Sequence, residues 1–190
     1  MSFVEQVEIA PLEQPSLQRF LKYLDAHLRD NGGDATGFFQ PLPAGSGLPS
    51  AKADAIEAGL TVPVGQPGWR RVWVALATRG RLLGHIDLRA RREPFTSHRC
   101  LLGMGVHRDH RGQGLGTRML DHAVRWAEQQ PILDWVDLEV ISTNEVAVRL
   151  YRRSGFIQVG RIDDLFRIEG QSLPSTEMTR LLSHALKQAL

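Results

Sequence analysis

The sequence predicts a single α/β (α+β) domain over residues 1–190, in which strands and helices alternate around one sheet. A length of 190 residues suits one domain. The 42% of hydrophobic and 23% of charged residues are ordinary for a protein with a packed core. Segments with alternating apolar residues, typical of strands, are interleaved with segments whose apolar residues recur at helical spacing.

The first third of the chain predicts a strand, two helices and a long irregular segment. Residues 3–9 alternate as a strand does, and Pro11 is expected to end it. Residues 16–31 predict a helix, because their apolar residues recur on one face. Two glycines follow and can end it. Residues 34–68 are irregular except for a helical segment at 51–60. We interpret 34–68 as a lid on the substrate side or, alternatively, as a mobile insertion.

A hairpin is predicted next, with strands at residues 71–78 and 82–89 and the turn at Arg79-Gly80. Three arginines follow it, and we interpret them as a solvated turn rather than as a patch for an acidic substrate. These are Arg89, Arg91 and Arg92.

Residues 98–106 predict a buried strand that leads through a basic glycine loop into a helix at 115–130. Gly103 and Gly105 are unusual in a strand, where glycine often marks a bulge or the close approach of a ligand. The strand therefore carries a special feature just before the loop.

The glycine loop has the chemistry of a phosphate site. The first turn of a helix leaves backbone N–H groups unpaired and carries the positive end of the dipole. Gly112, Gly114 and Gly116 let an anion approach those groups, and Arg111, with Arg108, adds positive charge. No Gly-Lys-Ser/Thr triplet follows, and the G-x-G-x-G spacing is not the dinucleotide pattern. We therefore expect a phosphate ester other than a nucleoside triphosphate or a dinucleotide.

The last part of the chain predicts three strands and one helix. Residues 135–141 alternate, which places Asp137 and Glu139 together on a solvated side. Asn144 can cap the following helix. Residues 156–167 and 172–181 predict two final strands, and 182–190 is a tail without a predicted structure.

The run Arg111-Gly112-Gln113-Gly114-Leu115-Gly116 resembles the R/Q-x-x-G-x-G/A signature of the GNAT superfamily of N-acetyltransferases, whose loop binds the pyrophosphate of acetyl-coenzyme A. Residues 138–156 resemble the strand, N-A-x-x-L-Y helix and G-F turn that close the coenzyme site in this family. The resemblance covers residues 70–181 well and the first third of the chain poorly. It implies a mixed, mostly antiparallel sheet of six to seven strands, splayed in its middle and flanked by about four helices.

The resemblance also implies a function and a division of the domain. We expect acetyl transfer from acetyl-coenzyme A to a primary amine by direct attack in a ternary complex. Residues 70–181 would form the coenzyme-binding core, and residues 1–69 the acceptor side. The implied coenzyme contacts are Met104, Gly105, Val106, Arg111, Gly112, Gln113, Gly114, Leu115, Gly116, Thr117, Asn144, Ala147 and Tyr151.

The catalytic groups follow from the tasks of acyl transfer. A backbone N–H between Met104 and Val106 is the implied donor to the oxyanion, and Tyr151 matches the position of the general acid. Many relatives carry a glutamate on the strand before the loop, where this chain has Leu101. His98 is our candidate base, with His85, Asp87 or a chain of waters as alternatives. The missing glutamate motivates a second hypothesis, a weakly active or inactive module that senses acyl-coenzyme A.

Other classes of function have less support. The histidines are dispersed and no Cys-x-x-Cys pair exists, so we expect no metal. A net charge of +2 with scattered arginines gives no case for nucleic acid. We expect no membrane segment and a cytoplasmic protein that acts on a small-molecule or peptide amine. Polyamines, amino acids, antibiotics and protein N-termini stay open as acceptors, as does a homodimer. Cys100, the one cysteine, is expected to be a buried thiol.

Overall fold

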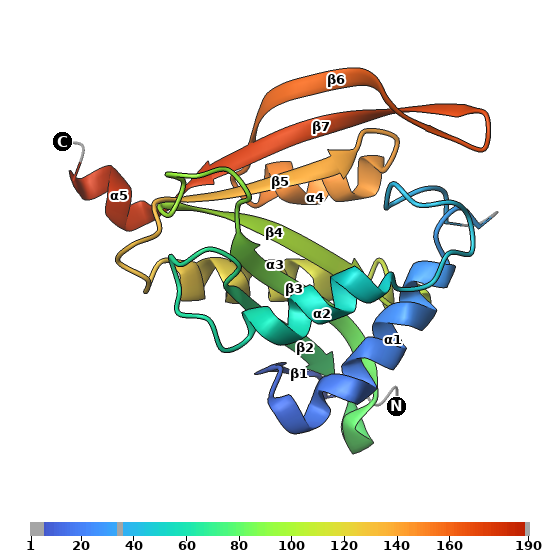
Figure 1. The fold of residues 1–190 in the computed structure, drawn as a ribbon, viewed down its shortest axis with the longest axis horizontal. Coiled ribbons are helices and arrows are strands. Elements are labelled where there is room, and N and C mark those ends of the chain that lie inside the picture. The colour runs from blue at the N-terminus through green and yellow to red at the C-terminus, as the bar shows by residue number, and fades with distance from the viewer. Residues whose placement is uncertain (1–5, 34–35, 189–190) are drawn as a thin grey trace.

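Seven strands form one mixed sheet in the computed structural model, which describes residues 6–33 and 36–188 (Figure 1). The strands are β1 (Glu8–Pro11), β2 (Arg70–Leu76), β3 (Leu82–Ala90), β4 (Arg99–Val106), β5 (Trp135–Ile141), β6 (Ile157–Ile168) and β7 (Gln171–Leu181). Their order in the sheet is β1-β2-β3-β4-β5-β7-β6. Every neighbouring pair is antiparallel except β4 and β5. The predicted fold class is confirmed.

Helices cover both faces of the sheet. They are α1 (Leu17–Arg29), α2 (Ser50–Gly59), α3 (Leu115–Ala127), α4 (Glu145–Arg153) and α5 (Ser183–Gln188), with 3-10 turns at Gln14–Ser16, Thr78–Gly80 and Arg108–His110. In Figure 1, α1 and α2 lie in front of the sheet, and α3 and α4 lie behind it. Because side chains alternate along a strand, Val72 and Val74 pack with α1 and α2, whereas Ile86 and Leu88 pack with α3.

The sheet opens between its two parallel strands. β4 and β5 pair only at Arg99–Trp135, Cys100–Val136 and Leu101–Asp137. Beyond these pairs, β4 continues beside β3 and β5 continues beside β7. A gap therefore separates the last part of β4 from β5, at the end of β4 that leads into the glycine loop.

Where β4 and β5 are still paired, the side chain of Asp137 links neighbouring segments. The alternation of β5 predicts that this side chain faces solvent. That assignment is wrong, because the side chain is only 5% exposed. Its Oδ2 accepts hydrogen bonds from Arg91 (2.9 Å) and from Nε of Arg99 (2.8 Å), and its Oδ1 accepts one from Thr179 (2.6 Å). Arg91 is thus held in an ion pair and is not part of a solvated turn.

Two further predictions need correction. β1 begins at Glu8 and includes Pro11, since β1 is an edge strand and proline is tolerated there; residues 3–5 lie outside the described residues. The pairing of β3 with β4 runs without a shift from Gly84–Val106 to Ala90–Cys100, so neither glycine of β4 forms a bulge against β3. A Cβ atom at Gly105 would lie 2.4 Å from Nε2 of His27, so this glycine admits a side chain from α1.

Candidate functional site

The glycine loop exposes backbone at the beginning of α3. Gly112 and Gly114 have φ values of 73° and 79°, which strongly favour glycine, and Gly114 directly precedes the helix. An added Cβ atom would meet nothing within 4 Å at either position. The space beside these two glycines is therefore open next to the beginning of α3, and the unpaired N–H groups at the beginning of a helix are groups that bind anions.

The neighbouring side chains of the loop have separate tasks. Arg111 is exposed, donates from Nε to the carbonyl of Val106 (3.0 Å), and lies 5.9 Å from the ring centre of Phe39. Gln113 donates to the carbonyl of Asp109 (3.1 Å). Leu115 is buried in the core, while Thr117 is exposed. Leu115 thus anchors the loop, and Arg111 can supply positive charge to a bound anion.

Gly116 is the point where three predicted segments meet. A Cβ atom there would lie 3.2 Å from Leu150 of α4, 3.7 Å from Met104 and 3.8 Å from Val106. The structure thereby brings the strand, the loop and α4 to one place. The absence of a side chain at this position permits the close packing.

Backbone N–H groups of β4 point into the gap. The N–H of His107 donates to the carbonyl of Leu83 (2.8 Å), and hydrogen-bonded pairs alternate with non-hydrogen-bonded pairs along antiparallel strands. By this alternation the N–H groups of Met104 and Val106 face away from β3, toward β5. Because β5 no longer pairs with β4 there, these donors line the opening between the strands.

Asn144 and Tyr151 lie at the two ends of α4. The side chain of Asn144 accepts a hydrogen bond from the N–H of Ala147 (3.3 Å), so it caps the helix. Tyr151 is 7% exposed and packs edge-to-face on Phe156, with ring centres 5.8 Å apart. Burial raises the pKa of Tyr151 to about 12, so the phenol stays protonated at neutral pH.

His98 lies at the other end of β4 from the glycine loop. It is exposed, and its carbonyl accepts the N–H groups of Asp134 (2.7 Å) and Trp135 (3.2 Å). The structure therefore does not bring His98 together with the loop or with the N–H groups of Met104 and Val106.

A cavity of about 440 Å³ lies on the face of the sheet that α1 and α2 cover, between these helices and strands β2 to β4. Asp87 is at its floor, with Oδ2 3.0 Å from Nη1 of Arg89 and 3.6 Å from Nη1 of Arg70. Burial raises the pKa of Asp87, but the guanidiniums of Arg89 and Arg70 outweigh burial and hold the pKa below its ordinary value. Asp87 is therefore an ionised carboxylate with two cationic partners.

Two histidines lie in contact at the same cavity. The rings of His27 and His85 are 5.4 Å apart and nearly perpendicular, and Nδ1 of His85 lies 3.4 Å from the hydroxyl of Tyr23. Burial lowers the pKa of His27 to about 4 and that of His85 to about 3. Both rings are therefore uncharged at neutral pH. The apolar pattern of α1 gave no signal that His27 would reach this place.

Segment 36–68 forms one wall of the cavity and is hydrogen-bonded to Asn31, just after the end of α1. The side chain of Asn31 donates to the carbonyls of Gln40 (3.1 Å) and Leu42 (2.8 Å) and accepts the N–H groups of Phe39 and Gln40. Asn31 is completely buried, so these bonds are shielded from water. Residues 34 and 35 of the predicted lid lie outside the described residues.

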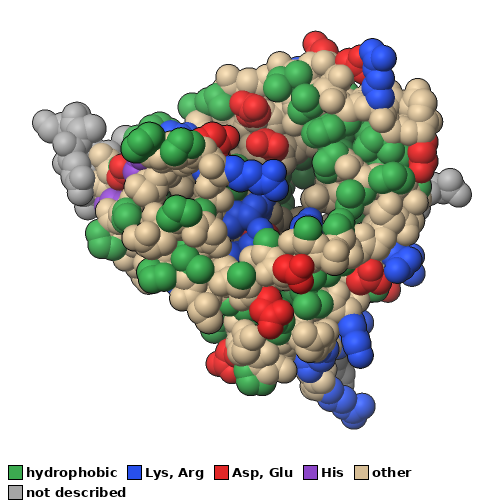
Figure 2. All heavy atoms as spheres, in the orientation of Figure 1, with side chains coloured by type: hydrophobic (Ala, Val, Ile, Leu, Met, Phe, Trp, Pro, Cys, Tyr) green, Lys and Arg blue, Asp and Glu red, His purple; other side chains and the backbone are tan. Residues whose placement is uncertain are grey.

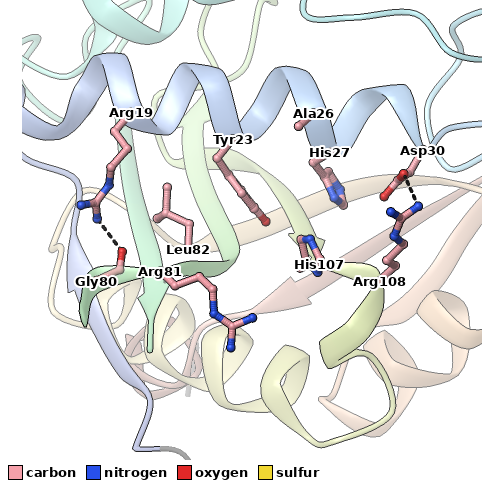
Figure 3. Close-up of a pocket in the computed structure, with 10 residues that line it drawn as sticks. All are labelled: Arg19, Tyr23, Ala26, His27, Asp30, Gly80, Arg81, Leu82, His107 and Arg108. Atoms are coloured by element: carbon pink, nitrogen blue, oxygen red, sulfur yellow. Dashed lines mark hydrogen bonds and ion pairs between the residues drawn. The ribbon is translucent and has the colours of Figure 1, made fainter. Parts of the chain in front are cut away.

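A second cavity, of about 340 Å³, lies between α1 and the loops beside β3 and β4 (Figure 3). Tyr23 and His27 point into it from α1. Two contacts close its ends, from Arg19 to the carbonyl of Gly80 (2.7 Å) and from Arg108 to Asp30 (3.2 Å). These contacts hold α1 against the sheet.

The described part of the chain contains neither a candidate metal centre nor a helix able to span a membrane. No group of three or more His, Cys, Asp or Glu residues among 6–33 and 36–188 is placed to hold a metal ion. Every helix in the same residues is too short or too polar to cross a membrane.

The chain matches one family model and is similar in fold to several solved structures. Residues 55–156, more than half of the chain, match the model of the acetyltransferase (GNAT) family. No curated protein matches the sequence. Among solved structures, an acetyltransferase of the GNAT family from Streptococcus pneumoniae is 20% identical with a TM-score of 0.76, and the match covers 94% of this chain and 100% of that one.

Two other solved structures are similar to the same extent. A GCN5-related N-acetyltransferase from Kribbella flavida is 20% identical with a TM-score of 0.71, covering 93% of this chain and 98% of that one. Spermidine N-acetyltransferase from Vibrio cholerae, in complex with CoA and spermine, is 18% identical with a TM-score of 0.70, covering 95% and 98%. At these identities the likeness shows the fold.

Proposed function

The chain belongs to the acetyltransferase (GNAT) family, and we propose that it transfers an acetyl group from acetyl-coenzyme A to a primary amine. The observation that carries the proposal is the glycine loop at the beginning of α3, which opens beside the gap between β4 and β5. Residues 70–181 would hold the coenzyme, and residues 1–69 would form most of the acceptor side.

The residues of the loop fit a coenzyme diphosphate. Gly112 and Gly114 leave room for phosphate oxygens beside the N–H groups of α3, and Arg111 can neutralise their charge. When bound, the coenzyme supplies an activated acetyl thioester. The gap between β4 and β5 would accept the pantetheine arm, because the backbone of β4 offers unpaired donors there.

Three tasks then fall to this chain. The N–H group of Met104 or Val106 donates to the carbonyl oxygen as negative charge develops on it. Tyr151 is a hydrogen-bond donor to the departing sulfur. Its phenol, with a pKa of about 12, holds its proton more tightly than a thiol of pKa about 8.5, so complete proton transfer is uphill unless the site assists it.

The third task, removal of the proton from the amine, has no strong base in the cavity. The pKa of His85 is about 3, and Asp87 is held ionised by two guanidiniums, so neither group is matched to an ammonium at neutral pH. His98 is exposed at the far end of β4. We therefore propose that the proton leaves through water and that no side chain replaces the glutamate that many relatives carry.

Binding and turnover test the proposal separately. Calorimetry with acetyl-coenzyme A should show binding, and a broad amine panel should yield one product heavier by one acetyl group together with one free thiol. Cys100 is completely buried and burial raises the pKa of its thiol, so the native protein contributes little to thiol detection. Absence of binding overturns the proposal. Binding without acetylation of any amine favours a sensor of acyl-coenzyme A.

A further inference from the structure

The cavity between α1, α2 and β2 to β4 has an unbalanced charge. Its charged lining residues are Lys52, Arg70, Arg89 and Arg92, which are cations, and Asp87, which is the one carboxylate. Figure 2 shows lysine and arginine side chains gathered in a hollow on this face of the molecule. His27 and His85 also line the cavity and add no charge at neutral pH, because burial lowers the pKa of both.

Two of the four cations make no direct contact with a carboxylate among the described residues, although Asp87 is near enough to Lys52 to raise its pKa and Arg92 is exposed to solvent. Asp87 is paired with Arg70 and Arg89. Within the part of the chain that the structure describes, the ammonium of Lys52 and the guanidinium of Arg92 form no hydrogen bond or ion pair. Burial lowers the pKa of Lys52, so its charge is partly desolvated. An anionic group of a ligand would relieve that cost, whereas a second cation would increase it.

Much of the remaining lining is apolar. α1 contributes Phe20 and Leu24, the following segment contributes Phe39, and α2 contributes Ile56. The cavity reaches β4 at Gly103 and Met104, where β4 has already separated from β5. A ligand there would thus lie across the strand from the proposed thioester site, with an apolar wall on one side and cations on another.

We propose that the acceptor is a primary amine that also carries a carboxylate bound by Lys52 and Arg92, with an apolar body packed against α1 and α2. This inference rests on the proposed acetyl transfer and narrows its acceptor. A polyamine is a poor fit, because each of its ammonium groups would add positive charge to a cavity in which cations already exceed carboxylates. The amino group would face β4 at Met104.

The test uses two sets of matched amines, one built on phenylalanine and one on leucine. Each set contains the L-amino acid, its uncharged amide and the amine without a carboxyl group, and spermidine is added as a polycation. Binding is measured by calorimetry with coenzyme A present, and turnover by product mass. We expect the amino acid to exceed its amide by about 10- to 100-fold in affinity and in kcat/KM, as for a charge-assisted hydrogen bond.

A substitution in the cavity should remove that preference. In Lys52→Gln we expect the ratio of amino acid to amide to fall about tenfold, with the affinity for acetyl-coenzyme A unchanged. Lys22→Gln is the matched control, since Lys22 is an exposed lysine of α1 that lines neither cavity. The control should keep the ratio of the unchanged protein.

The outcomes separate this inference from the proposed function. Preference for the amide or for spermidine, or an unchanged ratio in Lys52→Gln, overturns the carboxylate assignment. Binding of acetyl-coenzyme A without binding of any amine in the two sets also overturns it, while the coenzyme site stands. Failure to bind acetyl-coenzyme A instead overturns the proposed function, and the calorimetry of the amino acids alone still tests the cavity.

Discussion

The proposed coenzyme side and the proposed acceptor side of this protein differ in the groups that form them. The coenzyme side is made mainly of backbone, namely the N–H groups at the beginning of α3 and those of Met104 and Val106. The acceptor side is made of side chains from α1, α2, β2 and β3, among them Lys52, Arg70 and Asp87. We therefore expect the backbone groups to bind the coenzyme and the side chains to select the acceptor.

The acetyl transfer takes place where these two sides meet. Tyr151→Phe should slow this chemical step without changing the binding of coenzyme or acceptor. Removal of the phenol should lower kcat by about 100-fold or more, within the usual range for a general acid. The affinities for acetyl-coenzyme A and for the acceptor should change less than twofold, because the ring still packs on Phe156. Pre-steady-state thiol release and calorimetry measure the two effects. A twofold loss of kcat would remove Tyr151 from the mechanism.

A negatively charged side chain beside the backbone N–H groups of the coenzyme side should weaken the binding of the coenzyme. Asparagine and aspartate both tolerate the positive φ of Gly114, so Gly114→Asn and Gly114→Asp differ chiefly in charge. Aspartate also suits the beginning of α3, so folding should be retained. We expect Gly114→Asp to bind acetyl-coenzyme A about 30- to 100-fold more weakly than Gly114→Asn, as calorimetry at low salt can measure. Equal affinities would place the diphosphate elsewhere.

The same difference explains which parts of the fold and of the candidate site could be predicted from the sequence. The beginning of α3 after the glycine loop and both ends of β5 were predicted correctly because local spacing determines them, whereas α3 ends at Ala127 and not at residue 130. The pairing of β2 with β3 places Arg70 near Asp87. Lys52 is far from both in the sequence, and only the packing of α2 on the sheet brings it to them. Alternation along β5 assigned Asp137 to solvent, since it cannot show that arginines of neighbouring segments fold over that side. Arg89 was assigned to a solvated turn for the same reason, although it lies in β3 and pairs with Asp87. Arg92 is exposed, in agreement with that prediction.

The acceptor side should also make the fold sensitive to acid. The pKa of His27 in the folded protein, about 4, is below its ordinary value of 6.5, so between these values the unfolded chain binds more protons. Stability is complete above pH 6.5 and falls as the pH decreases, by up to about 1.4 kcal/mol per pH unit for one such group.

His27→Leu should therefore show a shallower loss of unfolding free energy between pH 6.5 and 4.5 than the unchanged protein. Urea denaturation at several pH values measures the slope. His98→Leu is the matched control, because His98 is exposed, and it should keep the original slope. Identical slopes in all three proteins would mean that His27 is not held in its neutral form by burial.

The smallest effect concerns Asn144, which could serve the fold, the coenzyme or both. Its side chain caps α4, and serine can cap a helix as well as asparagine can. We expect Asn144→Ala to lower the unfolding free energy by about 1 kcal/mol and Asn144→Ser to restore most of it. If the amide also contacts the coenzyme, as its place beside the gap favours, both variants should bind acetyl-coenzyme A a few-fold more weakly. Full affinity in Asn144→Ser would limit Asn144 to capping, and the coenzyme side would then depend still more on backbone groups.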